Sequence, residues 1–165
     1  MSAGAAALLV LAGAAYYFFF SQKIPAPETL YNSNLAGAYV PFTPIASGSR
    51  SSVSTRVNYV ITTSDQLAQL WKMIDVATPP PTVDFTKNVV LAVFAGKQPT
   101  TGFEISVDKI QDSTSTREVV INIAKPGGSC VLAQSETAPY QIVQTSITSL
   151  SLTHQDQVTT VSCLQ

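Results

Sequence analysis

Histidine, cysteine and clustered charge are all scarce in this 165-residue sequence. Charged residues make up 12% of the chain, about half the share of an average soluble protein. Nine basic residues stand against ten acidic ones, and no Lys/Arg cluster occurs. The electrostatic footprint of a nucleic-acid-binding protein is therefore missing, and we expect no nucleic-acid partner.

Residue patterns that carry catalysis or hold a cofactor are also missing. The one histidine, His154, lies in "SLTHQDQV" near a predicted turn, where a lone histidine is usually a surface residue. Acidic residues are scattered, and no G-x-S-x-G motif occurs. Gly127 and Gly128 lack the following Lys-Ser/Thr of a phosphate-binding loop, and neither cysteine has C-x-x-C metal spacing. We expect no enzyme activity, no cofactor and no metal.

The N-terminus contains the longest apolar run, "AGAAALLVLAGAAYYFFF" at residues 3–20. These eighteen residues reach the lower limit for a transmembrane helix, and Tyr16 and Tyr17 suit an interfacial aromatic belt. A cleaved signal peptide is the main alternative, since "AGA" at 12–14 resembles a cleavage site, although no basic residue precedes the run. A buried soluble helix is the third. We expect residues 1–22 to form an uncleaved membrane anchor.

The cysteines bear on which side of the membrane the rest of the chain lies. Cys130 and Cys163 are the only two, and an even pair in an exported domain predicts a disulfide. Two unrelated buried thiols are the alternative, because spacing does not establish geometry. Lys23 weakly favours the opposite orientation by the positive-inside rule. We expect a single-pass cell-membrane protein whose C-terminal domain is extracytoplasmic.

Two further regions follow the anchor. Residues 23–52 combine several prolines and glycines without sustained periodicity, which predicts an extended linker. Residues 53–165 predict one mostly β domain, an antiparallel β-sandwich or partly open barrel with one amphipathic helix. The helix is expected at 63–74, where Thr63 and Gln66 form a capping box before apolar residues at helical spacing. Strands are expected in "VNYVIT" (57–62), "NVVLAVFAG" (88–96), "FEISVDKI" (103–110), "REVVINIA" (117–124), "CVLAQS" (130–135), "YQIVQTSI" (140–147) and "QVTTVSCL" (157–164).

One loop stands out between two of these strands. The stretch "GKQPTTGFEIS" (96–106) places Pro99 and Gly102 around two threonines. Such a composition is sufficient for a hairpin turn, but it also suits a binding loop held out by a rigid sheet. Phe103 either anchors this loop or points into the core as the first inward residue of its strand. Tyr140, after Pro139, is likewise either a core aromatic or a contact residue.

The order of several segments resembles the PrcB C-terminal domain family. The segments are "LWKMI", "PPPTVDFTKNVVLAVFAGKQPTTGFEISVDKI" and "KPGGSCVLAQSETAPYQIV", and the resemblance covers roughly residues 56–145. This chain has Thr101 where the family usually has glycine, and Phe103 where tyrosine is usual. The family is named after a subunit of a cell-surface protease complex. The resemblance therefore implies a non-catalytic partner of a protease.

Three short segments also resemble the loops of chagasin-type cysteine-protease inhibitors, which have an Ig-like sandwich fold. They are "QPTTGF" (98–103), "PGGS" (126–129) and "APYQ" (138–141). This chain has Gln98 where those inhibitors have asparagine, and Ala138 where they have arginine. Taken together, the two resemblances imply a partner-binding set comprising Gln98, Pro99, Thr100, Thr101, Gly102, Phe103, Gly127, Gly128, Pro139 and Tyr140.

The sequence therefore predicts a membrane-anchored, extracytoplasmic domain that binds another protein. The favoured role is an accessory subunit of a cell-envelope protease complex. A chagasin-like protease inhibitor is one alternative. A structural envelope or filament subunit that self-assembles through its apolar N-terminus is the other.

Overall fold

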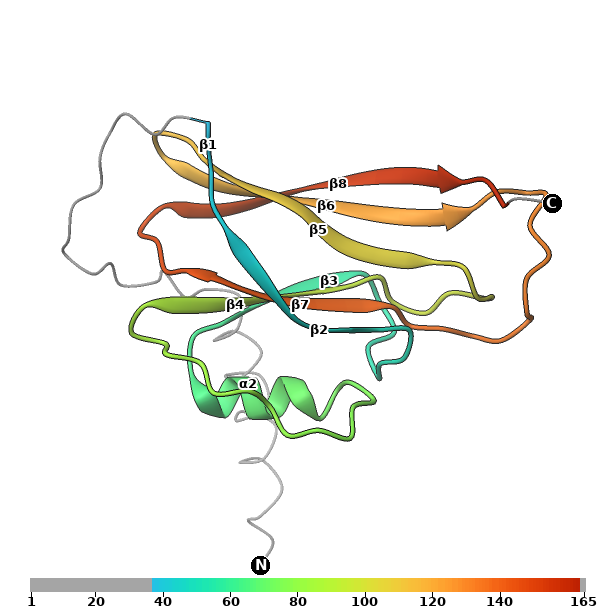
Figure 1. The fold of residues 1–165 in the computed structure, drawn as a ribbon, viewed down its shortest axis with the longest axis horizontal. Helices are drawn as coiled ribbons and strands as arrows, with labels where there is room; N and C mark the ends of the chain where they lie inside the picture. The colour runs from blue at the N-terminus through green and yellow to red at the C-terminus, as the bar shows by residue number, and fades with distance from the viewer. Residues whose placement is uncertain (1–36, 164–165) are drawn as a thin grey trace, which may run out of the picture.

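The computed structural model describes residues 37–163, which form two four-stranded sheets and one short helix (Figure 1). Sheet A has the strand order β1-β5-β6-β8, and sheet B has the order β2-β7-β4-β3. The strands are β1 (Ala38–Tyr39), β2 (Phe42–Gly48), β3 (Val57–Ile61), β4 (Asn88–Phe94), β5 (Glu104–Asp112), β6 (Thr116–Pro126), β7 (Tyr140–Ser146) and β8 (Ser151–Val161), and the helix is α2 (Ser64–Trp71). The expected mostly β fold with one helix is confirmed.

Strand β4 explains why the sheets stack, because both of its faces are buried. Val89, Leu91 and Val93 point into the cluster between the two sheets, together with residues of β5, β6 and β7. The intervening residues, including Ala92 and Phe94, point to the opposite face, which α2 covers. An uninterrupted apolar run is what a strand buried on both faces requires. The fold is thus three layers: sheet A, sheet B and the helix (Figure 1).

Helix α2 begins where the capping pattern predicts. The Thr63 side chain accepts a hydrogen bond from the Gln66 backbone N–H at 3.3 Å. The Gln66 side chain accepts in return from the N–H of Thr62, one residue earlier than in the usual capping box. Leu67, Leu70 and Trp71 are buried against sheet B. The expected amphipathic helix is confirmed, although it ends at Trp71 rather than near residue 74.

Three segments differ from the sequence-based expectations. Residues 38–48, expected in the linker, form β1 and β2 of the two sheets, so residue 52 is not the boundary of the folded part. Prolines are tolerated there because β2 is an edge strand with a register shift after Pro44. Residues 130–135 do not form a strand. His154 lies within β8 instead of near a turn.

The disulfide between Cys130 and Cys163 is present, with the two Cα atoms 5.2 Å apart. The expected anchor at residues 1–22 lies outside the described residues. Within residues 37–163, no helix has the length and apolar character needed to cross a membrane.

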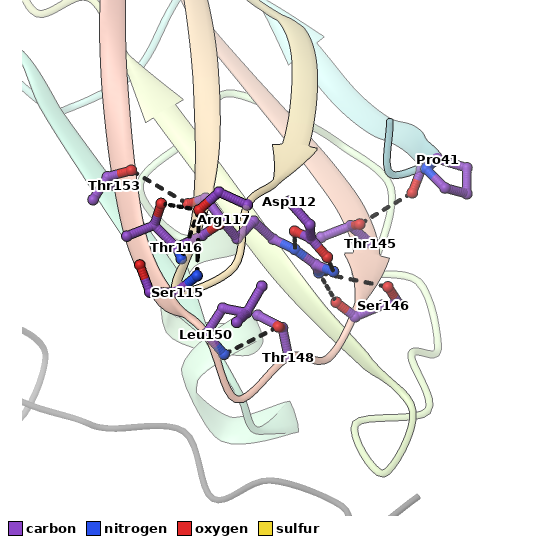
Figure 2. Close-up of polar contacts among 11 residues, drawn as sticks. Pro41, Asp112, Ser115, Thr116, Arg117, Thr145, Ser146, Thr148, Leu150 and Thr153 are labelled. Carbon is purple, nitrogen blue, oxygen red and sulfur yellow. Dashed lines mark hydrogen bonds and ion pairs between the residues drawn. The ribbon is translucent and has the colours of Figure 1, made fainter. Parts of the chain in front are cut away.

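A buried ion pair joins the sheets at the end of the sandwich where β5 meets β6 (Figure 2). Arg117 donates through Nε and Nη2 to the two carboxylate oxygens of Asp112, at 2.6 and 2.8 Å. Its Nη1 donates to the backbone carbonyl of Ser146, at the end of β7. Both charged residues are more than nine-tenths buried. The guanidinium therefore connects sheet A to sheet B without leaving a buried charge unpaired.

Candidate functional site: a loop platform at one end of the sandwich

Three connections meet at the end of the sandwich opposite the buried ion pair. They are the β2–β3 segment, the β4–β5 loop and the long β6–β7 connection, and Figure 1 shows them at the right-hand end with the C-terminus. Backbone hydrogen bonds join all three: Lys97 donates to the Ser54 carbonyl at 3.1 Å, and Ala138 donates to the Ser49 carbonyl at 2.8 Å. The stretch singled out in the sequence therefore belongs to a larger cluster of loops.

Gly96 sets the direction in which the β4–β5 loop leaves its strand. Its φ is +75°, a conformation that residues with a side chain rarely adopt. A Cβ atom at this position would lie 2.7 Å from the carbonyl carbon of Thr55 and 2.9 Å from the backbone nitrogen of Arg56. Glycine is required here for two reasons: the backbone conformation and the close approach of the β2–β3 segment.

The β4–β5 loop is held against the β6–β7 connection by backbone hydrogen bonds. Gln98 and Thr137 exchange two of them, at 2.7 and 3.0 Å, and the Thr137 hydroxyl donates to the Thr100 carbonyl at 3.0 Å. The Thr101 N–H donates to the Ala133 carbonyl at 3.2 Å. We call residues 96–103 together with 131–137 the loop platform. These contacts fix its two halves relative to each other.

The outer surface of the loop platform is mostly uncharged. Pro99 and Gly102 are exposed, and the Val131 side chain is fully exposed, with a relative accessibility of 102%. Lys97 and Glu136 form the one ion pair between the two halves, with Nζ and Oε1 2.8 Å apart and both side chains more than half exposed. Such an exposed pair contributes at most about 1 kcal/mol. An ordered backbone with exposed apolar groups suits binding to another polypeptide.

Gly102 lies within the platform, and Gly127 and Gly128 lie beside it. Gly102 has a φ of +90°, and a Cβ there would approach side-chain atoms of Leu132 and Pro126 at 3.0 and 3.3 Å. The Gly127 N–H donates to the carbonyl of Val161 at the end of β8, and its own carbonyl accepts from Cys130. The disulfide then ties this turn to the residues after β8. The structure thus brings residues 98–103 and 127–128 to one end of the molecule.

The two remaining expected contact residues do not lie on this surface. Pro139 is buried, and Tyr140 is 3% exposed and packs against the Phe94 ring with the ring centroids 6.0 Å apart. Burial, with a smaller contribution from the charge of Asp75, raises the pKa of Tyr140 above its ordinary value. Tyr140 is therefore a core aromatic. Phe103 is half-buried just before β5 and is not fully enclosed in the core.

Sequence reasoning missed the β6–β7 half of the platform. Three successive apolar residues, Val131, Leu132 and Ala133, are typical of a strand. The sequence around them does not reveal that the fold offers no neighbouring strand for them to pair with. The only β-bridge that this half makes is the isolated one between Thr137 and Gln98. Over the described part of the chain, no three His, Cys, Asp or Glu side chains are grouped closely enough to hold a metal ion.

Comparison with known proteins identifies one family. Residues 89–146 match the family model described as PrcB C-terminal, which confirms the resemblance found in the sequence. The match begins in β4 and ends at the last residue of β7, so it includes both halves of the loop platform but not α2. No curated protein and no solved structure matches this chain.

Proposed function

We propose that this PrcB C-terminal-like chain is a non-catalytic, protein-binding accessory subunit of a cell-envelope protease complex, and that the loop platform is its contact surface. The match of residues 89–146 to the PrcB C-terminal family supports the protease association that the sequence resemblance implies. The Cys130–Cys163 disulfide is consistent with an extracytoplasmic location. The proposal also includes the N-terminal run as its membrane anchor.

The observation that carries the binding role is the loop platform's combination of order and exposure. Its two halves are joined by the Gln98–Thr137 backbone pair and by the Thr137–Thr100 side-chain bond. Docking a partner therefore requires little additional ordering of the chain, which favours affinity. Pro99 and Val131 offer apolar groups that water covers in the free protein. Burying them in a partner is favourable at about 25 cal/mol per Å² of apolar surface.

An inhibitor role remains the second candidate, on one observation. The tips at 98–103 and 127–129 lie at the same end of the sandwich, as insertion into a protease cleft would require, and Gly102 lies close to Pro126. The third tip is different, because Pro139 and Tyr140 are buried. We therefore favour the accessory role over inhibition.

The test is a crosslinking pulldown of the full chain from native membranes, with proteins identified by mass spectrometry. The test variant is Val131→Asp, which introduces a charge into the apolar part of the loop platform. The side chain that it replaces is fully exposed. The matched control is Tyr39→Ser, which alters a side chain 71% exposed on β1, in sheet A. Both variants are expected to fold, because neither changes a core residue.

Recovery of a protease by the wild-type protein and by Tyr39→Ser, with its loss in Val131→Asp, would support the proposal. Equal recovery of the protease by all three proteins would place the contact elsewhere on the chain. Failure of every version to recover a protease would refute the accessory role. A peptide-cleavage assay of the recovered protease, with and without added wild-type protein, then separates the two candidate functions. An inhibitor suppresses cleavage, and an accessory subunit does not.

A further inference from the structure

Strand β8 has one edge that no strand within residues 37–163 pairs with. It is the last strand of sheet A, where it runs parallel to β6 over its whole length without a register shift (Figure 1). Its sequence, SLTHQDQVTTV, contains no proline, lysine or arginine. Natural edge strands usually carry such residues, or are short or irregular, because an open edge invites pairing with another chain.

Two of the other three outer strands are protected in these ways. Strand β1 is two residues long, and β2 contains Pro44 and a register shift. Strand β3 carries none of these residues but is less than half as long as β8, with five residues. Strand β8 has eleven residues without a proline or a register shift, and its one acidic side chain, Asp156, is paired with Arg56 of the same copy. The contrast within one molecule indicates that the β8 edge is open because a strand pairs there.

The backbone groups available for that pairing are defined by the hydrogen bonds to β6. Ser151 donates its N–H to the Ser115 carbonyl at 3.2 Å, and Val161 accepts from the Gly127 N–H at 2.9 Å. Both ends of β8 thus use odd-numbered residues to bond β6. Because backbone groups alternate along a strand, the even-numbered residues direct their N–H and C=O groups to the open edge. These residues are Leu152, His154, Asp156, Val158 and Thr160.

We propose that the occupant of this edge is β8 of a second copy of this chain, paired antiparallel across a two-fold axis at Gln155. In this register Leu152 of one copy lies opposite Val158 of the other, and His154 lies opposite Asp156. Each of these pairs forms twice by symmetry. The register thus matches an apolar side chain with an apolar one, and an imidazole with a carboxylate.

The two neighbouring registers are poorer. An axis at Asp156 would place two carboxylates directly opposite each other, which is unfavourable in a sheet. An axis at His154 would place the two imidazoles opposite each other and Leu152 opposite Asp156. Of these three registers, only the axis at Gln155 matches an apolar side chain with an apolar one and an imidazole with a carboxylate.

Two observations on individual side chains fit this register. Val158 is 58% exposed, an unusual position for a valine in the middle of a strand, and the pairing places it beside Leu152 of the second copy. Asp156 already receives two hydrogen bonds from Arg56, at 2.9 and 2.7 Å. Its charge is therefore compensated within each copy, so bringing two strands together carries little charge repulsion, and its remaining lone pairs can accept from the histidine.

The assembly would close at two copies. The pairing joins two A sheets into one continuous sheet, whose outer edges are then β1 and the part of β5 that β1 does not pair. Strand β1 has two residues, and that part of β5 carries Lys109 and a register shift next to it, so neither offers a regular edge for further growth. A closed dimer, and not an open filament, is the expected product.

The test uses cysteines placed on β8 of the full chain. In an antiparallel pair, the residues at the axis are directly opposite each other, with Cα atoms about 4.5–5.5 Å apart, which is within the range of a disulfide. Gln155→Cys is therefore expected to crosslink to its own copy under mild oxidation. Gln157→Cys is the matched control: it has the same wild-type residue and the same outer face of β8, and it is also exposed. In the proposed register its two copies are four residues apart along the strands, about 13–14 Å.

Nonreducing electrophoresis is expected to show covalent dimer for Gln155→Cys and none for Gln157→Cys. Adding Val158→Pro to Gln155→Cys removes one edge-facing N–H without removing a bond to β6, and is expected to abolish the crosslink. Mass spectrometry of the Cys130–Cys163 peptide confirms that each variant retains its native disulfide. Equal crosslinking at both positions would overturn the proposed register. The absence of a crosslink at Gln155→Cys in a folded protein would overturn the proposal as well, because β8 of a second copy would then not cover this edge.

Discussion

Removal of the disulfide is the perturbation whose magnitude follows most directly from the structure. Cys130 and Cys163 are 33 positions apart, so reducing the bond frees a loop of that length in the unfolded chain. The loop-closure relation converts this length into about 3–4 kcal/mol of lost folding free energy. For a folded region of this size the loss corresponds to a fall in Tm of roughly 10–20 °C. The variant is Cys130→Ser combined with Cys163→Ser.

Urea unfolding followed by the fluorescence of Trp71 measures this loss. Trp71 is the only tryptophan, is 8% exposed, and donates from Nε1 to the Thr78 carbonyl at 2.7 Å, so its signal reports on the core between α2 and sheet B. The double variant should unfold at lower urea with a slightly larger m-value, because its unfolded chain is more expanded. A loss below about 1 kcal/mol would refute the loop-closure reasoning and mean that the native disulfide mainly positions the chain locally.

Three further predictions concern the turn glycine, the buried ion pair and an exposed carboxyl. Gly96→Ala should lower the free energy of unfolding by about 2–4 kcal/mol, measured by urea unfolding, because a Cβ meets backbone at 2.7 Å in a positive-φ position; an unchanged midpoint would contradict this. Asp112→Ala should cost about 3–5 kcal/mol by leaving Arg117 buried and unpaired, whereas Asp112→Leu with Arg117→Met should cost much less, and equal losses would argue against the electrostatic cause. Hydrogen bonds from Thr86 lower the pKa of Asp84 below its ordinary value. The stabilising contribution of Asp84 is therefore present above the unfolded pKa and is lost as the pH falls through the folded pKa. Asp84→Asn should flatten the acid side of a Tm-versus-pH curve, and parallel curves for the variant and the wild type would contradict this.

The elements that the sequence predicted correctly are those whose signals are local. Thr63 and Gln66 sit at fixed offsets before an apolar periodicity, so the start of α2 follows from the sequence alone. The run at 88–94 is long, apolar and rich in valine, which is typical of a strand buried on both faces. In both cases the local preference agrees with the tertiary environment.

The elements that the sequence did not predict correctly depend on pairing. Half of β8, 151–156, is polar and shows no alternation, because the backbone ladder with β6 holds it in place without burying its side chains. Strand β2 was concealed by its proline, Pro44, which an edge position tolerates. The segment 130–135 is apolar enough for a strand but has no neighbour to pair with.

The candidate site was half predictable for the same reason. Pro99 and Gly102 mark the β4–β5 loop in the sequence, because turns need their special φ values. The exposure of Val131 and the burial of Tyr140 are not local properties. They depend on the path of the β6–β7 connection around the end of the sandwich, which only the assembled sheets define.

The central claim is that the loop platform contacts a protease, and site-specific photocrosslinking tests it most directly. A photoreactive amino acid is placed at position 131 or, as a control, at position 39 of the full chain, and native membranes are irradiated. Both positions carry side chains that are largely exposed, at 102% and 71%. The account predicts an adduct with a protease subunit from position 131 and none from position 39. A protease adduct from both positions, or from neither, would contradict it.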